Sequence, residues 1–159
     1  MASNSGGLPA GAVVTDSNVV IAMTSVEAGR SSAAQSALSQ YLLQGYALYA
    51  PAIAAYETLY VLCGKLASGL LTANDYRAAI AAFQRAMTTI KPPPNGEMSL
   101  ITRAEQIAAG YGCSRSADSF YIALAEEFTR TVPTSLLTFD RDLPKQAARN
   151  APTVQVHLL

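Results

Sequence analysis

The sequence predicts an α/β fold in three layers, with helices on both faces of a mostly parallel sheet of about five strands. Short apolar runs alternate with longer segments of helical period, as in βαβ units. The runs are almost continuously apolar, which is typical of strands buried on both faces. A chain of 159 residues, 50% of them hydrophobic, is long enough for one such domain. We expect that domain over 12–159, after a flexible leader at 1–11.

The first half of the chain is predicted to hold two strands and three helices. The β-branched residues of "AVVTD" (12–16) indicate a buried strand, and a short helix follows it through Met23. Apolar residues recur with a helical period over 31–46. A proline ends the second strand, "ALYAP" (47–51), and one helix is expected from 52 to 68. The apolar side of that helix is predicted to consist of Ile53, Tyr56, Tyr60 and Val61.

The next helix has a recognisable start. Thr72 is placed to cap it, and Asp75 lies in its first turn, where a carboxylate favours the helix dipole. Its buried stripe is predicted to continue through Phe83. "TTIKPPPNG" (88–96) is expected to contain a short edge strand, which its prolines end.

The second half of the chain repeats the alternation of helix and strand. Helices are expected at about 97–110 and 116–130. "TSLLTFD" (134–140) is the second strand that ends in an aspartate. A short helix near 143–149 and a terminal strand within 153–159 complete the predicted order.

Charge and cysteine content limit the possible functions. The chain has 11 basic and 11 acidic residues, so no global basic field indicates nucleic-acid binding. If four acids were gathered in one site, the remaining surface would carry 11 − 7 = +4. Cys63 and Cys113 lack metal-ligand spacing and are predicted to be two buried thiols. No apolar window is long enough for a membrane span and no secretory leader is visible, so we expect a cytoplasmic protein.

Four acids stand out by their surroundings. Asp16 and Asp140 each follow a strand, and the carboxyl ends of parallel strands meet at one edge of a sheet. Glu57 and Asp118 lie in apolar helical segments, where an ionised carboxylate needs a partner. For any one of these acids, a helix-cap or surface ion-pair role is the commoner explanation, and Asp16 in particular could simply cap a helix.

The four acids together favour a metal site. Only Lys65 and Arg115 offer a nearby positive charge on the helices that carry Glu57 and Asp118. Converging carboxylates would raise one another's pKa values, and a divalent cation removes that conflict. Oxygen ligands favour Mg²⁺ or Mn²⁺, because the one histidine, His157, lies near the chain end.

At these residues the sequence resembles the PIN-domain family, and most of all its VapC-type toxin ribonucleases. "VVTDSNVVIA" is similar to the family's opening strand and turn, and "YAPAIAAYETLYVLCGKLASGLLT" to the segment with its second acid. "YGCSRSADSFYIALAEE" resembles the aspartate that opens a helix, and "LLTFDRDL" the closing motif. The resemblance runs from about residue 12 to the end of the chain.

The resemblance implies a metal-dependent endoribonuclease that hydrolyses RNA phosphodiester bonds with Mg²⁺ or Mn²⁺. Carried over by position, the metal-binding and catalytic acids would be Asp16, Glu57, Asp118 and Asp140. Hydroxyl and amide groups that orient the carboxylates would be those of Ser17, Asn18 and Thr138. Candidates for RNA contacts are Arg115 and Arg141, followed by Lys65 and Arg30. The resemblance also implies that the protein is a toxin bound by a cognate antitoxin, and that it forms a homodimer.

Other functions remain open at the level of sequence. The chain could be a stand-alone PIN nuclease for RNA processing, or a catalytically silent binding module that keeps the fold. A signalling receiver domain is disfavoured, because Asp16 stands alone and no aspartate follows "ALYAP". The eight tyrosines mostly follow helical stripes and are predicted to pack in the core rather than stack on bases.

Overall fold

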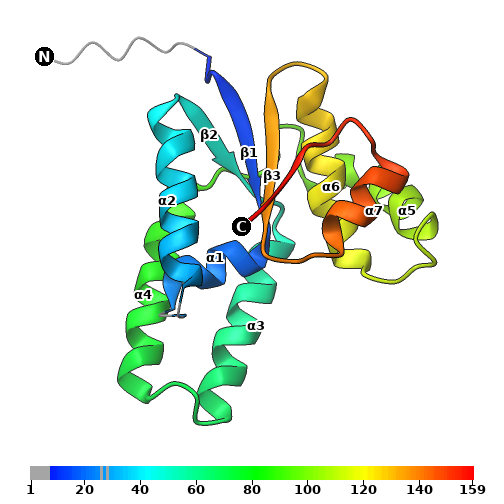
Figure 1. The fold of residues 1–159 in the computed structure, drawn as a ribbon. Coiled ribbons are helices and arrows are strands. Elements are labelled where there is room, and N and C mark those ends of the chain that lie inside the picture. The colour runs from blue at the N-terminus through cyan, green and yellow to red at the C-terminus, as the bar shows by residue number, and fades with distance from the viewer. Residues whose placement is uncertain (1–7, 26, 28) are drawn as a thin grey trace, which may run out of the picture.

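The computed structural model describes residues 8–25, 27 and 29–159, and in them the predicted α/β fold is confirmed. A four-stranded sheet has the order β2-β1-β3-β4, and every neighbouring pair is parallel. The strands are β1 (Gly11–Thr15), β2 (Tyr46–Tyr49), β3 (Thr134–Thr138) and β4 (Val156–Leu158). In Figure 1 helices α1 to α4 lie on one side of the sheet and α5 to α7 on the other.

The helices agree with the predicted ones to within a few residues. The first four are α1 (Ser17–Thr24), α2 (Arg30–Leu43), α3 (Ile53–Ala67) and α4 (Ala73–Thr89). The others are a 3₁₀ turn, η1 (Glu97–Leu100), followed by α5 (Ile101–Ala109), α6 (Ser116–Thr129) and α7 (Leu143–Asn150). The capping box of α4 is present, because Thr72 Oγ1 accepts a hydrogen bond of 3.1 Å from the Asp75 backbone N–H.

The fifth strand expected within 88–96 is reduced to one isolated parallel bridge between Tyr49 and Lys91. The Lys91 backbone N–H donates to Leu48 at 2.8 Å, and its carbonyl accepts from Ala50 at 3.1 Å. Pro92 follows directly and has no N–H to offer, so the ladder ends there. The sheet therefore has four strands in the described residues, one fewer than predicted.

The core lies between the two central strands and the helices that cover them. All five residues of β1 are buried, and so are Leu136 and Leu137 of β3. Helix α6 contributes the fully buried Tyr121, Ile122 and Leu124. Burying such side chains supplies most of the stability of the fold, at roughly 25 cal/mol per Å² of apolar surface. The carboxyl ends of β1 and β3 are thereby held rigidly side by side.

The prediction for the apolar side of α3 was wrong for its two tyrosines. Tyr56 and Tyr60 are 70% and 74% exposed, whereas the buried positions are Ala54, Thr58 and Leu62. Helix α3 packs against α1 and α4, and these small or branched side chains allow that contact. Only the half-buried Ile53 and Val61 were placed on the correct side.

The prediction of two buried thiols was also wrong. Cys63 and Cys113 are both exposed and not joined by a disulfide. Cys63 lies on the outward side of α3, and Cys113 lies in the turn after α5, where its φ is +55°. Neither segment turns its cysteine toward the core.

Two further expectations meet the structure only in part. No helix in the described residues is long and apolar enough to cross a membrane. Residues 1–7 of the expected leader lie outside the described residues, and its last residue, Gly11, belongs to β1.

Candidate active site

The two central strands bring Asp16 and Asp140 to one edge of the sheet. β1 and β3 are parallel neighbours, with Thr15 opposite Leu137, so both end at the same level. In the sheet, β1 has β2 on one side and β3 on the other. The strand order therefore reverses direction at the carboxyl end of β1. Open α/β sheets place their ligands at such a switch point.

Asp16 occupies the cap position of α1, but its carboxylate does not cap the helix. The Asp16 side chain accepts no capping hydrogen bond from the backbone N–H groups of the helix N-terminus. Instead the carboxylate, which is 4% exposed, accepts hydrogen bonds from Thr138 Oγ1 at 2.6 Å, Asn18 Nδ2 at 2.8 Å and Ser17 Oγ at 3.3 Å. Of the two interpretations of Asp16 left open by the sequence, simple capping is therefore wrong.

The Thr138 hydroxyl joins the ends of the two strands. It donates to Asp16 and accepts from the Asp140 backbone N–H at 2.9 Å and from Asn18 Nδ2 at 3.2 Å. A hydroxyl has one proton and two lone pairs, so its capacity is fully used. Asn18 Oδ1 also accepts from the Phe139 backbone N–H at 3.0 Å. The hydrogen bonds from Ser17, Asn18 and Thr138 thus all reach the Asp16 carboxylate, and these are the residues to which the resemblance assigns an orienting role.

Glu57 faces Asp16 from helix α3. The Tyr121 hydroxyl of α6 donates to Glu57 Oε2 at 2.6 Å, which ties the two helices together across the site. Burial raises the pKa of Asp16 above its ordinary value, the hydrogen bond from Thr138 opposes that rise, and the charge of Glu57 adds to it. Burial and the hydrogen bond to Glu57 likewise raise the pKa of Tyr121, which keeps its proton on the hydroxyl.

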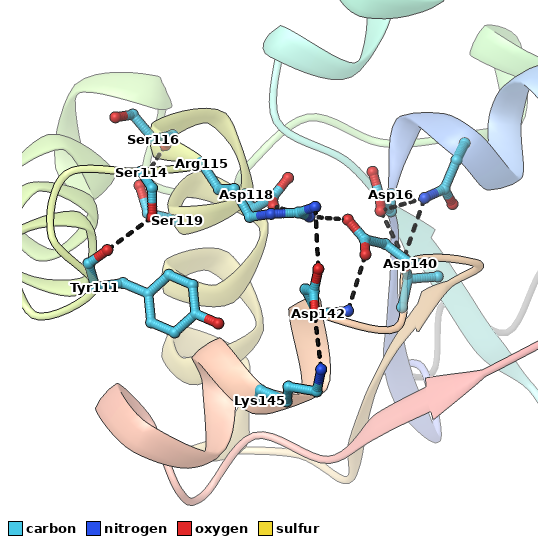
Figure 2. Close-up of polar contacts among 12 residues, drawn as sticks. Asp16, Tyr111, Ser114, Arg115, Ser116, Asp118, Ser119, Asp140, Asp142 and Lys145 are labelled. Atoms are coloured by element: carbon cyan, nitrogen blue, oxygen red, sulfur yellow. Dashed lines mark hydrogen bonds and ion pairs between the residues drawn. The ribbon is translucent and has the colours of Figure 1, made fainter.

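Asp118 lies in the first turn of α6, beside a cluster of opposite charges. Figure 2 shows the Arg115 guanidinium between Asp118 and Asp140, with Asp142 and Lys145 next to it. Arg115 forms ion pairs with Asp140, with Asp118 Oδ2 at 3.3 Å and with Asp142 Oδ2 at 3.3 Å. The Lys145 ammonium bonds Asp142 at 2.8 Å. One guanidinium therefore holds three carboxylates at this end of the site.

The titration of Asp118 is strongly shifted as well. Burial raises its pKa to about 6; the charge of Asp16 adds to the rise, Arg115 opposes it, and Asp140 adds to it. Its side chain is 17% exposed. The dependence on Asp16 and Asp140 places all three carboxylates within electrostatic reach of one another.

The donor set suits a hard divalent cation, although no closed cage is built. In the part of the chain that the structure describes, no three His, Cys, Asp or Glu side chains lie close enough to hold a metal together. Arg115 supplies the positive charge between Asp118 and Asp140 instead. All candidate donors are carboxylate oxygens, the ligand type that Mg²⁺ and Mn²⁺ prefer. The residues fit such an ion by their chemistry, and Arg115 is bonded to two of them.

The remaining predicted residues contact groups other than the four acids. Lys65 forms an ion pair with Glu27, which also lies 3.8 Å from Arg30. The guanidinium of Arg30 lies 5.3 Å from the centre of the Phe139 ring, and both line a cavity with Arg141. His157 is exposed on β4 next to Tyr41, away from the acids.

Two residues of the site were missed or undervalued by sequence reasoning. Tyr121 follows Asp118 by three positions, which places both on one side of α6, yet its role as the partner of Glu57 depends on a contact between two helices. Asp142 forms an ion pair with its sequence neighbour Lys145 and also belongs to the Arg115 cluster. The closely spaced charges of "RDLPK" were the available signal for that cluster.

Fold and site together define an α/β domain with converging acids at the carboxyl ends of its central strands. The PIN domain family model matches residues 13–149. The chain therefore belongs to the PIN domain family, whose members have a nuclease fold and are generally metal-dependent ribonucleases. A search of curated proteins returned no match.

Proposed function

We propose that this protein is a metal-dependent endoribonuclease and the toxin of a type II toxin–antitoxin pair. The observation that carries the proposal is that Asp16, Glu57, Asp118 and Asp140 are linked by charge interactions around the carboxyl ends of the central strands. Burial and mutual charge raise the pKa values of Asp16 and Asp118 there, although the described residues do not form a closed metal cage. The acting unit is the domain at 12–159, and its place of action is the cytoplasm.

The four acids would hold one or two Mg²⁺ or Mn²⁺ ions. Such ions, when bound, lower the pKa of a coordinated water and neutralise charge on phosphoryl oxygens. Thr138, Asn18 and Ser17 orient the Asp16 carboxylate by their hydrogen bonds. Tyr121 does the same for Glu57. No serine or cysteine nucleophile is needed for this chemistry.

Arg115 has two roles in this proposal. In the cation-free site its guanidinium offsets the charges of Asp118 and Asp140. If those carboxylates held a cation, the Arg115 guanidinium would be available to bond an RNA phosphate, the function that its position in the motif suggests. Arg141 and Lys65 are further candidates for phosphate contacts at the rim.

The toxin assignment adds two partners. An antitoxin would cover the acidic edge, and a second copy of the chain would form a homodimer. Co-expression with the neighbouring short reading frame tests the first, and sedimentation of the purified chain tests the second. A stand-alone RNA-processing nuclease would show cleavage but no such antitoxin.

The decisive experiment is cleavage of a mixed set of labelled RNAs by the purified protein with Mg²⁺ or Mn²⁺. We expect cleavage that is lost with EDTA and lost in Asp118→Asn. Calorimetric titration with Mg²⁺ and Mn²⁺ accompanies it. Absence of both cleavage and cation binding would overturn the proposal and favour a silent binding module. Cleavage that persists in EDTA would also overturn the metal assignment.

A further inference from the structure

Helix α3 presents two tyrosine rings to solvent beside the acidic edge. Tyr56 and Tyr60 are 70% and 74% exposed and stand four residues apart, so they lie on the same side of the helix. Glu57, which faces the acids, lies between them in sequence. Neighbouring aromatic side chains that are exposed to solvent often mark an interaction site, and tyrosine is enriched where proteins bind partners or ligands.

The two rings line a cavity that opens into the candidate active site. Its volume is about 290 Å³, and its walls are Ser17, Tyr56, Glu57, Tyr60 and Val61. Ser17 donates to the Asp16 carboxylate, and Glu57 accepts from Tyr121. A group bound in this cavity would therefore lie directly beside the acids.

The chemistry of the walls favours a nucleobase. Aromatic faces stack on bases of any type, and single-stranded RNA is recognised mainly through unpaired bases placed on such faces. The phenolic hydroxyls and the Glu57 carboxylate supply polar groups around the rings. A partner helix would need an extended apolar groove, whereas this cavity is short and contains a carboxylate.

We propose that Tyr56 and Tyr60 form a stacking platform for a base next to the phosphate that is cleaved, and so select single-stranded RNA. This inference rests on the proposed function, because it takes RNA as the ligand. Paired bases already have both faces covered, so a double helix cannot use the platform. The platform adds affinity that requires the presence of a base, of whatever type. Phosphate contacts, in contrast, depend only on charge.

The test compares nucleic acids that differ only in their bases. Asp118→Asn protein in Mg²⁺ serves as the binding form, so that the RNA stays intact. Fluorescence anisotropy measures its affinity for labelled eight-nucleotide oligoadenylate and oligouridylate, and for an abasic chain of the same length and charge. We expect Tyr56→Ala with Tyr60→Ala to weaken RNA binding by about tenfold per stacked base, and to leave abasic binding unchanged.

Two control variants isolate the rings. Tyr56→Phe with Tyr60→Phe keeps both faces and removes the hydroxyls, and it should bind RNA almost as the parent does. Leu70→Ala removes a side chain that is 75% exposed just beyond the end of the same helix, and it should have no effect. Because all these side chains are exposed, none of the substitutions should change the fold, which circular dichroism verifies.

The outcomes separate this inference from the function on which it rests. If wild-type protein cleaves RNA but the double alanine variant binds RNA as tightly as the parent, the platform is wrong and the proposed function stands. If the variant loses affinity for RNA and abasic chain equally, the rings do not stack on bases. A wild-type dimer that dissociates in the double alanine variant, with RNA affinity per protomer unchanged, would assign the rings to a protein interface. A wild-type protein that neither binds nor cleaves RNA overturns both proposals.

Discussion

The two central strands each end beside a carboxylate, and the protein offsets those two charges in different ways. Asp16, after β1, is buried and receives hydrogen bonds from the neutral groups of Thr138 and Asn18. Asp140, after β3, is half-buried and bonds the guanidinium of Arg115. Neutral donors fix the geometry of a carboxylate but leave its charge in place, whereas an ion pair cancels the charge and can be exchanged. Under the proposed function, the β1 end would hold a ligand in a fixed position, and at the β3 end a metal cation would replace Arg115 as the partner of the carboxylates.

Removing the charge at the β1 end should have the largest effect. Asp16→Asn keeps the shape of the side chain and an oxygen that accepts the hydrogen bond from Thr138. It removes the negative charge of a carboxyl group whose pKa is raised by burial. We expect cleavage of RNA to be lost and the free energy of unfolding to stay level or rise by about 1 kcal/mol, as when a strained functional charge is removed. Cleavage assays and urea denaturation measure the two effects. An active Asp16→Asn protein would contradict the site assignment.

Removing the Thr138 hydroxyl, which links the carboxyl ends of β1 and β3, should have the next largest effect. Thr138→Val keeps the shape of the side chain and removes the hydroxyl that bonds Asp16, Asn18 and the Asp140 backbone N–H. We expect a loss of roughly 1–3 kcal/mol in stability, because buried groups lose their partner, and a fall in cleavage of about 10- to 100-fold. Thr138→Ser, which retains the hydroxyl, is the matched control. Equal activity of the valine and serine variants would show that the link is dispensable.

The charge at Asp118 should appear as a pH dependence of stability in EDTA. Its pKa is raised from an ordinary 3.8 to about 6, so the folded state holds this proton more tightly than the unfolded chain does. The stabilisation is fully present below about pH 4 and is lost as the pH rises through about 6. It amounts to about 3 kcal/mol before the reduction by the screening that its partial exposure allows.

Asp118→Asn removes that titration, so the difference between the two unfolding curves over pH 4–6 is the measurement. Other acids, such as Glu126, have lowered pKa values and act in the opposite direction. The difference curve cancels their contribution. A flat difference curve would mean that neither burial nor the charges of Asp16 and Asp140 raise the pKa of Asp118.

How far the sequence predicts this molecule depends on the range of the interaction. Strand ends and helix starts are local, so the placement of Asp16 and Asp140 and the cap at Thr72 followed from neighbouring residues. The exposure of Tyr56 and Tyr60 could not be predicted in the same way. An apolar residue every three or four positions marks a side of the helix, but which side is buried depends on α1 and α4.

The candidate site shows the same division. The four acids were found because each stands in a distinctive local pattern. Their partners were found only when nearby in sequence, as Arg115 is to Asp118. The pairing of Tyr121 with Glu57, by contrast, joins residues 64 positions apart. Such contacts are set by packing of distant segments, which periodicity does not encode.

The exchange proposed for the β3 end predicts a gain of function for one variant. Arg115→Gln removes the cation that bonds Asp118 and Asp140, so these carboxylates would bind Mg²⁺ without first losing a partner. Because the guanidinium is 38% exposed, its pairs are screened, and we expect calorimetry to show Mg²⁺ binding tighter by only about two- to fivefold. Thermal unfolding should be shifted more by Mg²⁺ in the variant than in the wild type.

Lys145→Gln is the matched control, because it removes a cation of the same cluster that bonds only Asp142. It should leave Mg²⁺ binding unchanged. If Arg115 also contacts phosphate, Arg115→Gln should bind RNA more weakly while it binds Mg²⁺ more tightly, since one side chain serves the two ligands in opposite ways. Weaker Mg²⁺ binding in Arg115→Gln would instead mean that the guanidinium orients the carboxylates, and the β3 end would then be as fixed as the β1 end.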